Sequence, residues 1–124
     1  IEVIDSRYRD FKFDLKSVIA DNTSAARFVV GGACVASAGV DLRTTGIVLE
    51  KNGEVVALGA GAAVLGHPAA AIAMLVNKLA ERGETLPAGT LVLSGGITEA
   101  VAVGAGDHIT LRVQGMGSVS IRFV

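Results

Sequence analysis

Residues 44–58 read Thr-Thr-Gly-Ile-Val-Leu-Glu-Lys-Asn-Gly-Glu-Val-Val-Ala-Leu, two largely apolar runs on either side of Asn52-Gly53. Asn and Gly accept the positive φ angles that a tight hairpin turn requires. The stretch therefore predicts a β-hairpin whose turn lies at Asn52-Gly53.

The residues after the hairpin predict one helix and several short strands. The helix is expected over Ala69–Arg82, opened by Pro68 and closed by Gly83. Its apolar face follows the i, i+3, i+4, i+7 spacing with Ile72, Leu75, Val76 and Leu79. Four later segments are predicted as strands: Thr90–Ser94, Ala100–Val103, His108–Val113 and Ser118–Val124. This order favours an α+β fold with a mixed sheet and antiparallel pairing.

The N-terminal stretch is less regular. Within Ser17–Gly31, Val18-Ile19-Ala20 fits a helix or a strand, whereas Phe28-Val29-Val30 is predicted to be extended. The chain opens at Ile1, inside an apolar alternation, rather than with Met. We therefore expect residues 1–124 to be the C-terminal part of a longer protein.

Composition favours one globular domain with an aliphatic core. The chain is 51% hydrophobic but only 4% aromatic, and its 16 glycines are typical of a turn-rich β protein. Its net charge of −1, without clustered Lys or Arg, argues against binding to nucleic acids or anionic membranes. Cys34 stands alone, which excludes an intrachain disulfide and is typical of a cytoplasmic protein. We expect it to be a small buried hydrophobe.

No membrane span and no common catalytic motif is predicted. Val55–Leu75 is apolar, but its glycines and His67-Pro68 fit a strand, a loop and a helix better than a lipid-facing helix. The chain has no phosphate-binding loop, no His-Glu-x-x-His motif and no nucleophile elbow. Gly59-Ala60-Gly61 lacks the further glycines of a dinucleotide-binding loop.

Two carboxylates near the start of the chain are candidates for chemistry. Glu2 and Asp5 lie three residues apart in a segment suited to burial, where a carboxylate needs a cation, a metal or several donors. A structural pair between Asp5 and Arg7 is the favoured hypothesis from composition. The alternative is a metal site, for which carboxylate oxygens suit Mg²⁺ or Mn²⁺ rather than zinc.

A second candidate is the polar run Asp21-Asn22-Thr23-Ser24. Two hypotheses stay open for it. It forms a helix N-cap or an Asx turn, or it is a loop of donors that binds the carboxylate or carbonyl of a small acid. His67 is predicted to cap the helix that begins at Pro68, and His108 to be a surface or packing residue.

Seven motifs, taken in order, resemble the fumarylacetoacetate hydrolase superfamily. They are Glu2–Tyr8, Phe11–Phe13, Ala20–Ser24, Glu50–Glu54, Leu65–Pro68, Ser94–Thr98 and Gly115–Val119. Together they span essentially the whole chain with compatible spacing. The resemblance implies a mixed β-roll that is incomplete at its N-terminus, with residues 1–124 as the C-terminal part of a single catalytic domain.

The same resemblance implies a divalent ion, usually Mg²⁺ and otherwise Mn²⁺, held by three carboxylates. Glu2 matches the third of them, and the first two belong to a Glu-x-Glu pair expected upstream of residue 1. Ser24 matches a position near the substrate carboxylate. Gly96 stands where related hydrolases often carry Thr, which argues against hydrolysis of a carbon–carbon bond. Ser24 and Gly96 are therefore predicted to bind substrate, with Glu2 as the metal ligand.

Within the superfamily the chain is most similar to the decarboxylases, in Arg7-Tyr8 with Phe11–Phe13, in Gly59–Val64 and in Gly95–Thr98. The resemblance implies metal-dependent decarboxylation of 2-oxo-3-hexenedioate to 2-oxopent-4-enoate in the meta-cleavage degradation of aromatic compounds. The alternatives are a 2-oxopent-4-enoate hydratase, and a non-catalytic assembly module, since the chain holds one metal carboxylate and is expected to be inactive by itself. Expected partners are a small dicarboxylic keto acid, the hydratase and further copies in a cytoplasmic homo-oligomer.

Overall fold

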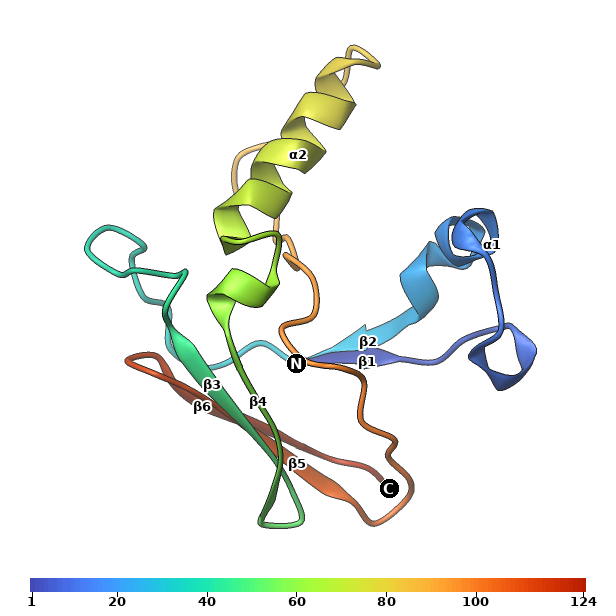
Figure 1. Cartoon of the computed structure of the whole chain (residues 1–124), viewed down its shortest axis with the longest axis vertical. Helices are drawn as coiled ribbons and strands as arrows, with labels where there is room; N and C mark the ends of the chain where they lie inside the picture. The colour runs from blue at the N-terminus through green and yellow to red at the C-terminus, as the bar shows by residue number, and fades with distance from the viewer. The chain divides into compact units, whose positions relative to one another are not determined.

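The computed structural model describes all residues, 1–124, and divides them into two compact units. We call Ile1–Val30 the N-terminal unit and Gly31–Val124 the sheet unit. Both contain helix and strand (Figure 1). The predicted α+β class is therefore confirmed.

The N-terminal unit is built on a two-stranded antiparallel ribbon. Strand β1 (Glu2–Ile4) pairs with β2 (Ala25–Phe28), so that Glu2 lies opposite Phe28 and Ile4 opposite Ala25. Between them the chain forms helix α1 (Leu15–Ala20) and two short 3₁₀ turns, η1 (Arg9–Phe11) and η2 (Asn22–Ser24). The ambiguous segment is thus helical up to Ala20 and forms a strand over Ala25–Phe28, so that only Phe28 of the predicted extended run 28–30 lies in a strand.

Helix α1 begins where a side chain satisfies its free backbone donors. The carboxylate of Asp14 accepts a hydrogen bond of 2.8 Å from the Ser17 N–H. This is an N-cap, which stabilises the first turn of a helix. The bond also lowers the pKa of Asp14, because it favours the ionised carboxylate.

The sheet unit contains four antiparallel strands in the order β4-β3-β5-β6. Their bounds are Gly46–Lys51 for β3, Glu54–Ala60 for β4, His108–Val113 for β5 and Gly117–Arg122 for β6. The predicted hairpin is confirmed: β3 and β4 join at Asn52 and Gly53, whose φ angles are 54° and 87°. The two strands predicted last in the chain are confirmed as β5 and β6.

One face of this sheet carries the aliphatic core. Ile47 and Ile109 are buried on it, and Val64 is the third buried apolar residue of the unit. A Cβ added at Gly59, which pairs with Ile47, would meet the side chain of Ile97. The segment around Ile97 therefore lies against the sheet where β4 has no side chain.

Helix α2 (Pro68–Ala80) follows the short turn η3 (Gly61–Ala63) and buries none of its residues. The predicted cap is confirmed, because His67 Nδ1 accepts a 3.0 Å hydrogen bond from the Ala69 N–H. Gly61–Ala80 meets the length and hydropathy criteria for a membrane-spanning helix, which core helices of soluble proteins also meet. Its continuous α-helix, Pro68–Ala80, is about 20 Å long at 1.5 Å per residue, shorter than the hydrocarbon core of a bilayer.

Three predictions are wrong. Residues 90–94 and 100–103 are not strands, because neither segment pairs with a neighbour in the sheet. Cys34 is exposed rather than buried. His108 is exposed, as the surface alternative predicted.

Candidate active site

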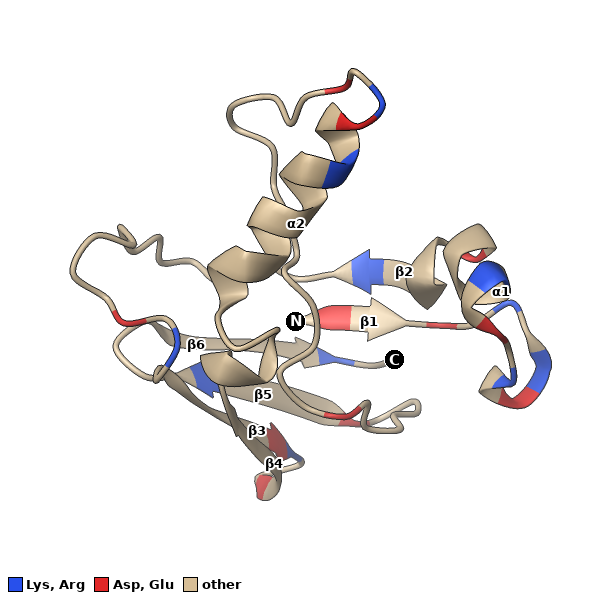
Figure 2. Ribbon diagram, turned by 45° about the horizontal axis from the view of Figure 1, so that its top comes forward, with Lys and Arg blue, Asp and Glu red and all other residues tan.

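Strand β1 presents a carboxylate that has no partner within the chain. Glu2 lies at the start of β1, where Figure 2 shows an acidic residue in red. Its side chain is exposed and makes no hydrogen bond or ion pair with the rest of the chain. Nowhere do three His, Cys, Asp or Glu side chains gather closely enough to hold a metal ion. Glu2 can therefore supply one hard oxygen ligand, but the His, Cys, Asp and Glu side chains of this chain do not by themselves form a three-ligand site.

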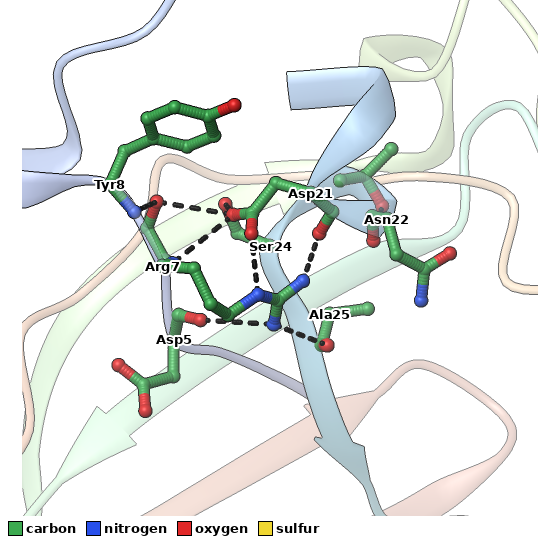
Figure 3. A network of polar contacts seen from close by, with 9 residues as sticks. Asp5, Arg7, Tyr8, Asp21, Asn22, Ser24 and Ala25 are labelled. Carbon is green, nitrogen blue, oxygen red and sulfur yellow. Dashed lines mark hydrogen bonds and ion pairs between the residues drawn. The ribbon is translucent and has the colours of Figure 1, made fainter. Parts of the chain in front are cut away.

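Beyond β1, Arg7 forms an ion pair with the buried Asp21. The Arg7 Nε contacts Asp21 Oδ1, and the side chain of Asp21 is only 3% exposed. Arg7 Nη2 donates to the Asp21 carbonyl, and Nη1 donates to the carbonyls of Asp5 and Ala25 at 3.2 Å each (Figure 3). The predicted pair between the Asp5 and Arg7 side chains is wrong: Arg7 contacts only the backbone of Asp5. The exposed Asp5 needs no counter-ion, whereas the buried Asp21 does.

The other oxygen of Asp21 collects three donors. Asp21 Oδ2 accepts hydrogen bonds from Ser24 Oγ at 3.0 Å, Ser6 Oγ at 3.2 Å and the Arg7 N–H at 3.3 Å. Burial by itself raises the pKa of Asp21. The bonds from Ser24 and Arg7 and the charge of Arg7 outweigh it, so the pKa lies below its ordinary value. Asp21 is therefore ionised at neutral pH.

The turn after Asp21 has an unusual backbone. Asn22, Thr23 and Ser24 have φ angles of 52°, 55° and 60°. These values lie in the left-handed region, which residues other than glycine rarely adopt. The Ser24 N–H donates to the Asp21 carbonyl at 3.0 Å, and the Ser24 carbonyl accepts from the Asp5 N–H at 2.8 Å. The N-cap hypothesis for this run is wrong, because Asp14 is the N-cap of α1, whereas Asp21 is its C-cap residue and makes no side-chain cap bond to η2.

The structure places the two predicted substrate residues in different surroundings. Ser24 is 2% exposed, and its hydroxyl is committed to Asp21. Gly96 belongs to the sheet unit, where it follows Gly95 at a φ of 113°, and a Cβ at Gly96 would lie 3.2 Å from the Thr98 carbonyl oxygen. Both assignments stay predictions.

The sequence did not indicate which residue of the polar run 21–24 is exposed and free to bind a ligand. Asn22 is exposed, and its side-chain amide makes no hydrogen bond within the chain (Figure 3). The only signal in the sequence was the cluster of four short polar residues, which does not say which of them turns inward. The structure shows that Asp21 and Ser24 do so and that Asn22 does not.

Glu2 and the turn belong to the same ribbon. Ile4 pairs with Ala25, the residue after the turn, and Glu2 lies two residues further along β1. At about 3.3 Å per residue the two features are separated by roughly 7 Å along the strand.

The comparisons with known proteins agree with this fold. The family model for the C-terminal part of fumarylacetoacetate hydrolase matches residues 3–124. A 4-oxalocrotonate decarboxylase from Pseudomonas putida is 66% identical over 124 residues, which is all of this chain and 47% of that protein. A 2-hydroxyhexa-2,4-dienoate hydratase from Comamonas testosteroni is 39% identical over 122 residues, covering 98% of this chain and 46% of the hydratase.

Solved structures give the same answer. The 4-oxalocrotonate decarboxylase from Pseudomonas putida G7, complexed with magnesium and adipate, superposes with a TM-score of 0.95 at 65% identity. The match covers 99% of this chain and 47% of that one. A complex of the decarboxylase from the same strain with calcium and acetate gives 0.92 at 63% identity, covering 99% and 46%.

This chain thus spans about half the length of the curated relatives it matches. The family model nevertheless covers nearly all of its residues, and the decarboxylase structure has the same fold at high identity. The chain belongs to the fumarylacetoacetate hydrolase family.

Proposed function

We propose that this chain forms the C-terminal part of a metal-dependent decarboxylase that converts 2-oxo-3-hexenedioate, also called 4-oxalocrotonate, to 2-oxopent-4-enoate. The observation that carries the proposal is the gap in identity between relatives. The chain is 66% identical to a decarboxylase along its whole length but 39% identical to a hydratase. The proposal places the reaction in the meta-cleavage degradation of aromatic compounds, in line with the names of these relatives.

Glu2 is the residue of this chain that would hold the ion. Its side chain is exposed, lies on a paired strand and forms no ion pair with a Lys or Arg of this chain. The relative's complex with magnesium supports Mg²⁺ as the metal. When bound, a divalent ion supplies Lewis-acid stabilisation at the 2-keto oxygen, where negative charge develops as CO₂ leaves.

The turn Asn22–Ser24 would orient the substrate acid. Its exposed face carries the free amide of Asn22, and its inward face is fixed by the bond from Ser24 to Asp21. The related decarboxylase binds adipate, a six-carbon dicarboxylate that lacks the keto group and the double bond. Adipate is therefore a suitable non-reacting probe of this site.

The test uses a complete enzyme that contains these residues. A defined version is a chimera in which residues 1–124 replace the matching half of the Pseudomonas putida decarboxylase. CO₂ release from 2-oxo-3-hexenedioate is measured with added Mg²⁺, for the parent and for Glu2→Gln. Loss of a residue that hydrogen-bonds to a metal ligand typically costs 10- to 100-fold in activity or metal affinity. Because Glu2 would be a ligand itself, we expect Glu2→Gln to reduce the rate of CO₂ release by at least this factor.

The control is Glu54→Gln, which removes an exposed carboxylate at the start of β4 that has no ion-pair partner. It should leave CO₂ release unchanged. Equal activity of Glu2→Gln and the parent at limiting Mg²⁺ would contradict the role of Glu2. A parent that releases no CO₂ from the substrate would contradict the decarboxylase assignment.

The second candidate is a hydratase that adds water to 2-hydroxypenta-2,4-dienoate. The 39% identity to a hydratase over nearly the whole chain favours keeping it. Incubation with each substrate separates the two, because one enzyme releases CO₂ and the other consumes the dienol without gas release.

The proposal extends to the assembly and location of the enzyme. We expect a homo-oligomer that associates with 2-oxopent-4-enoate hydratase in the cytoplasm. The family resemblance supports this proposal. Light scattering of the complete enzyme, alone and with the hydratase, tests both associations.

A further inference from the structure

We propose that Arg7 and Asp21 form a positioning pair, which holds the left-handed turn Asn22–Ser24 at a fixed place relative to the strand that bears Glu2. The inference rests on the proposed function and adds two residues to the substrate site that act through the turn rather than by touching substrate. It predicts that loss of the pair weakens binding of the dicarboxylate without weakening binding of the metal.

The first observation is how many segments the Arg7 guanidinium joins. It contacts the carboxylate and carbonyl of Asp21, the carbonyl of Asp5 after β1 and the carbonyl of Ala25 at the start of β2. A planar guanidinium offers donors in a rigid fork, so these contacts fix direction as well as distance. The group therefore joins both strands of the ribbon to the residue that opens the turn.

The second observation is the strain of that turn. Three successive residues other than glycine occupy the left-handed region, where each costs about 1–2 kcal/mol. Such a backbone persists only where surrounding contacts over-determine it. Here the contacts are those of Asp21, which binds Ser24 through its carboxylate and its carbonyl.

The third observation is that the turn is held at both ends. Asp21 is tied to Ser6 and Arg7, the residues that follow β1. At the other end, Ala25 pairs with Ile4 on β1. The turn therefore cannot shift along the ribbon without breaking one of these connections, which pre-organises its exposed face for a ligand.

The experiment measures two dissociation constants in the chimera described above: that of Mg²⁺ alone, and that of adipate at saturating Mg²⁺, both by calorimetry. The variants are Asp21→Asn and the conservative Arg7→Lys. We expect Asp21→Asn to raise the adipate constant about tenfold, the effect of losing a hydrogen-bonded charge pair, while the Mg²⁺ constant changes less than about twofold. Arg7→Lys keeps the charge but not the fork and should give a smaller rise, about threefold.

The matched controls alter two ion pairs of the sheet unit. Arg112→Lys alters the pair in which Arg112 Nε lies 2.9 Å from Glu50 Oε1, and Asp107→Asn alters the contact of Asp107 with Lys51. Neither should change the adipate constant. A purely structural role of Arg7 and Asp21 would reduce the folded fraction and leave the dissociation constant of the folded protein unchanged.

Three outcomes overturn the inference: an unchanged adipate constant in both variants, equal weakening of Mg²⁺ and adipate, or an unmutated chimera that binds no adipate. If Asp21→Asn does not fold, Arg7→Lys decides by the same criteria. The KM for 2-oxo-3-hexenedioate should rise in parallel with the adipate constant. Failure of the proposed function looks different, because the unmutated chimera would bind adipate with Mg²⁺ but release no CO₂.

Discussion

The N-terminal unit and the sheet unit of this chain are built in opposite ways. The sheet unit has four strands in regular antiparallel register, with Ile47, Val64 and Ile109 buried. The N-terminal unit has one short ribbon, no buried apolar residue, a buried carboxylate and five of the seven non-glycine residues with positive φ. Five of the seven is a large share for Ile1–Val30, about a quarter of the chain.

The difference shows that backbone strain is concentrated in the N-terminal unit and apolar burial in the sheet unit. Apolar burial and regular backbone pairing stabilise the sheet unit, whereas ionic and polar contacts hold the N-terminal unit in a backbone that is costly by itself. Backbone strain of this kind concentrates at functional sites. Both Glu2 and the turn Asn22–Ser24 lie in the strained unit.

The largest expected effect comes from breaking the regular unit by adding a methyl group at Gly61. A Cβ there would overlap the backbone carbonyl of Leu42 and lie 3.1 Å from Pro68 Cγ. Backbone cannot move aside as a flexible side chain does, so we expect Gly61→Ala to destabilise by about 3 kcal/mol, the upper end of overpacking costs. Urea denaturation of the chimera measures it.

Gly32→Ala is the matched control, because a Cβ at Gly32 meets nothing within 4 Å. Its urea midpoint should stay close to that of the parent. A midpoint for Gly61→Ala equal to that of Gly32→Ala would show that the approach of Leu42 to Gly61 is not a constraint.

Acid should weaken the polar contacts of Asp107 in the sheet unit. Lys51, Asn52 and the Gly104 N–H bind the carboxylate of Asp107 and lower its pKa from 3.8 to about 2. A lowered pKa in the folded state means that the contribution to stability is complete above the unfolded value. It is lost as pH falls from about 4 to about 2.

Asp107→Asn should therefore lose less stability than the parent between about pH 5 and about pH 2.5. Urea midpoints at the two pH values measure this difference. The pKa of Asp21 is lowered too, so acid should also release the turn of the N-terminal unit. Equal acid sensitivity of the parent and Asp107→Asn would contradict the assignment.

The smallest expected effect comes from replacing Thr by Gly once in each unit. The change should stabilise the N-terminal unit and destabilise the sheet unit. Thr23→Gly removes a left-handed cost of about 1–2 kcal/mol and adds about 0.5–1 kcal/mol of chain entropy, for a net gain of about 0.5 kcal/mol. Thr110→Gly, within β5, relieves no such strain and should destabilise by about 1 kcal/mol. Thermal denaturation of both variants measures the signs, and destabilisation by Thr23→Gly would show that the turn is not strained.

Features that depend on neighbouring residues were predictable from the sequence. The hairpin at Asn52-Gly53, the helix opened by Pro68 with its His67 cap, and the strands β5 and β6 all follow from local backbone preferences and short-range spacing. The family resemblance and the fold class followed from the motifs. The expectation that Glu2 and Asp5 lie in a segment suited to burial is wrong, because both residues are exposed.

Features that depend on distant partners were not predictable. Residues 90–94 and 100–103 alternate or are apolar as strands are, but a strand forms only where a neighbour accepts its backbone bonds, and the sheet offers them none. The partner of Arg7 lies fourteen residues away, beyond a helix that was itself ambiguous. Nothing in the sequence says that Asp21 is buried and Asp5 is not, and burial decides which acid takes the cation.

The hairpin turn also bears on how this protein ages. Asn-Gly is the dipeptide most prone to deamidation, in which the following backbone nitrogen attacks the asparagine side chain and leaves isoaspartate. Here both ends of the Asn52 amide are occupied: Nδ2 donates to Asp107 Oδ1 and Oδ1 accepts from the His108 N–H, each at 2.8 Å. These two bonds restrain rotation of the amide while the sheet is intact. Isoaspartate at position 52 would thus record the time that a molecule has spent unfolded, and it would accumulate first in preparations stored under partly denaturing conditions.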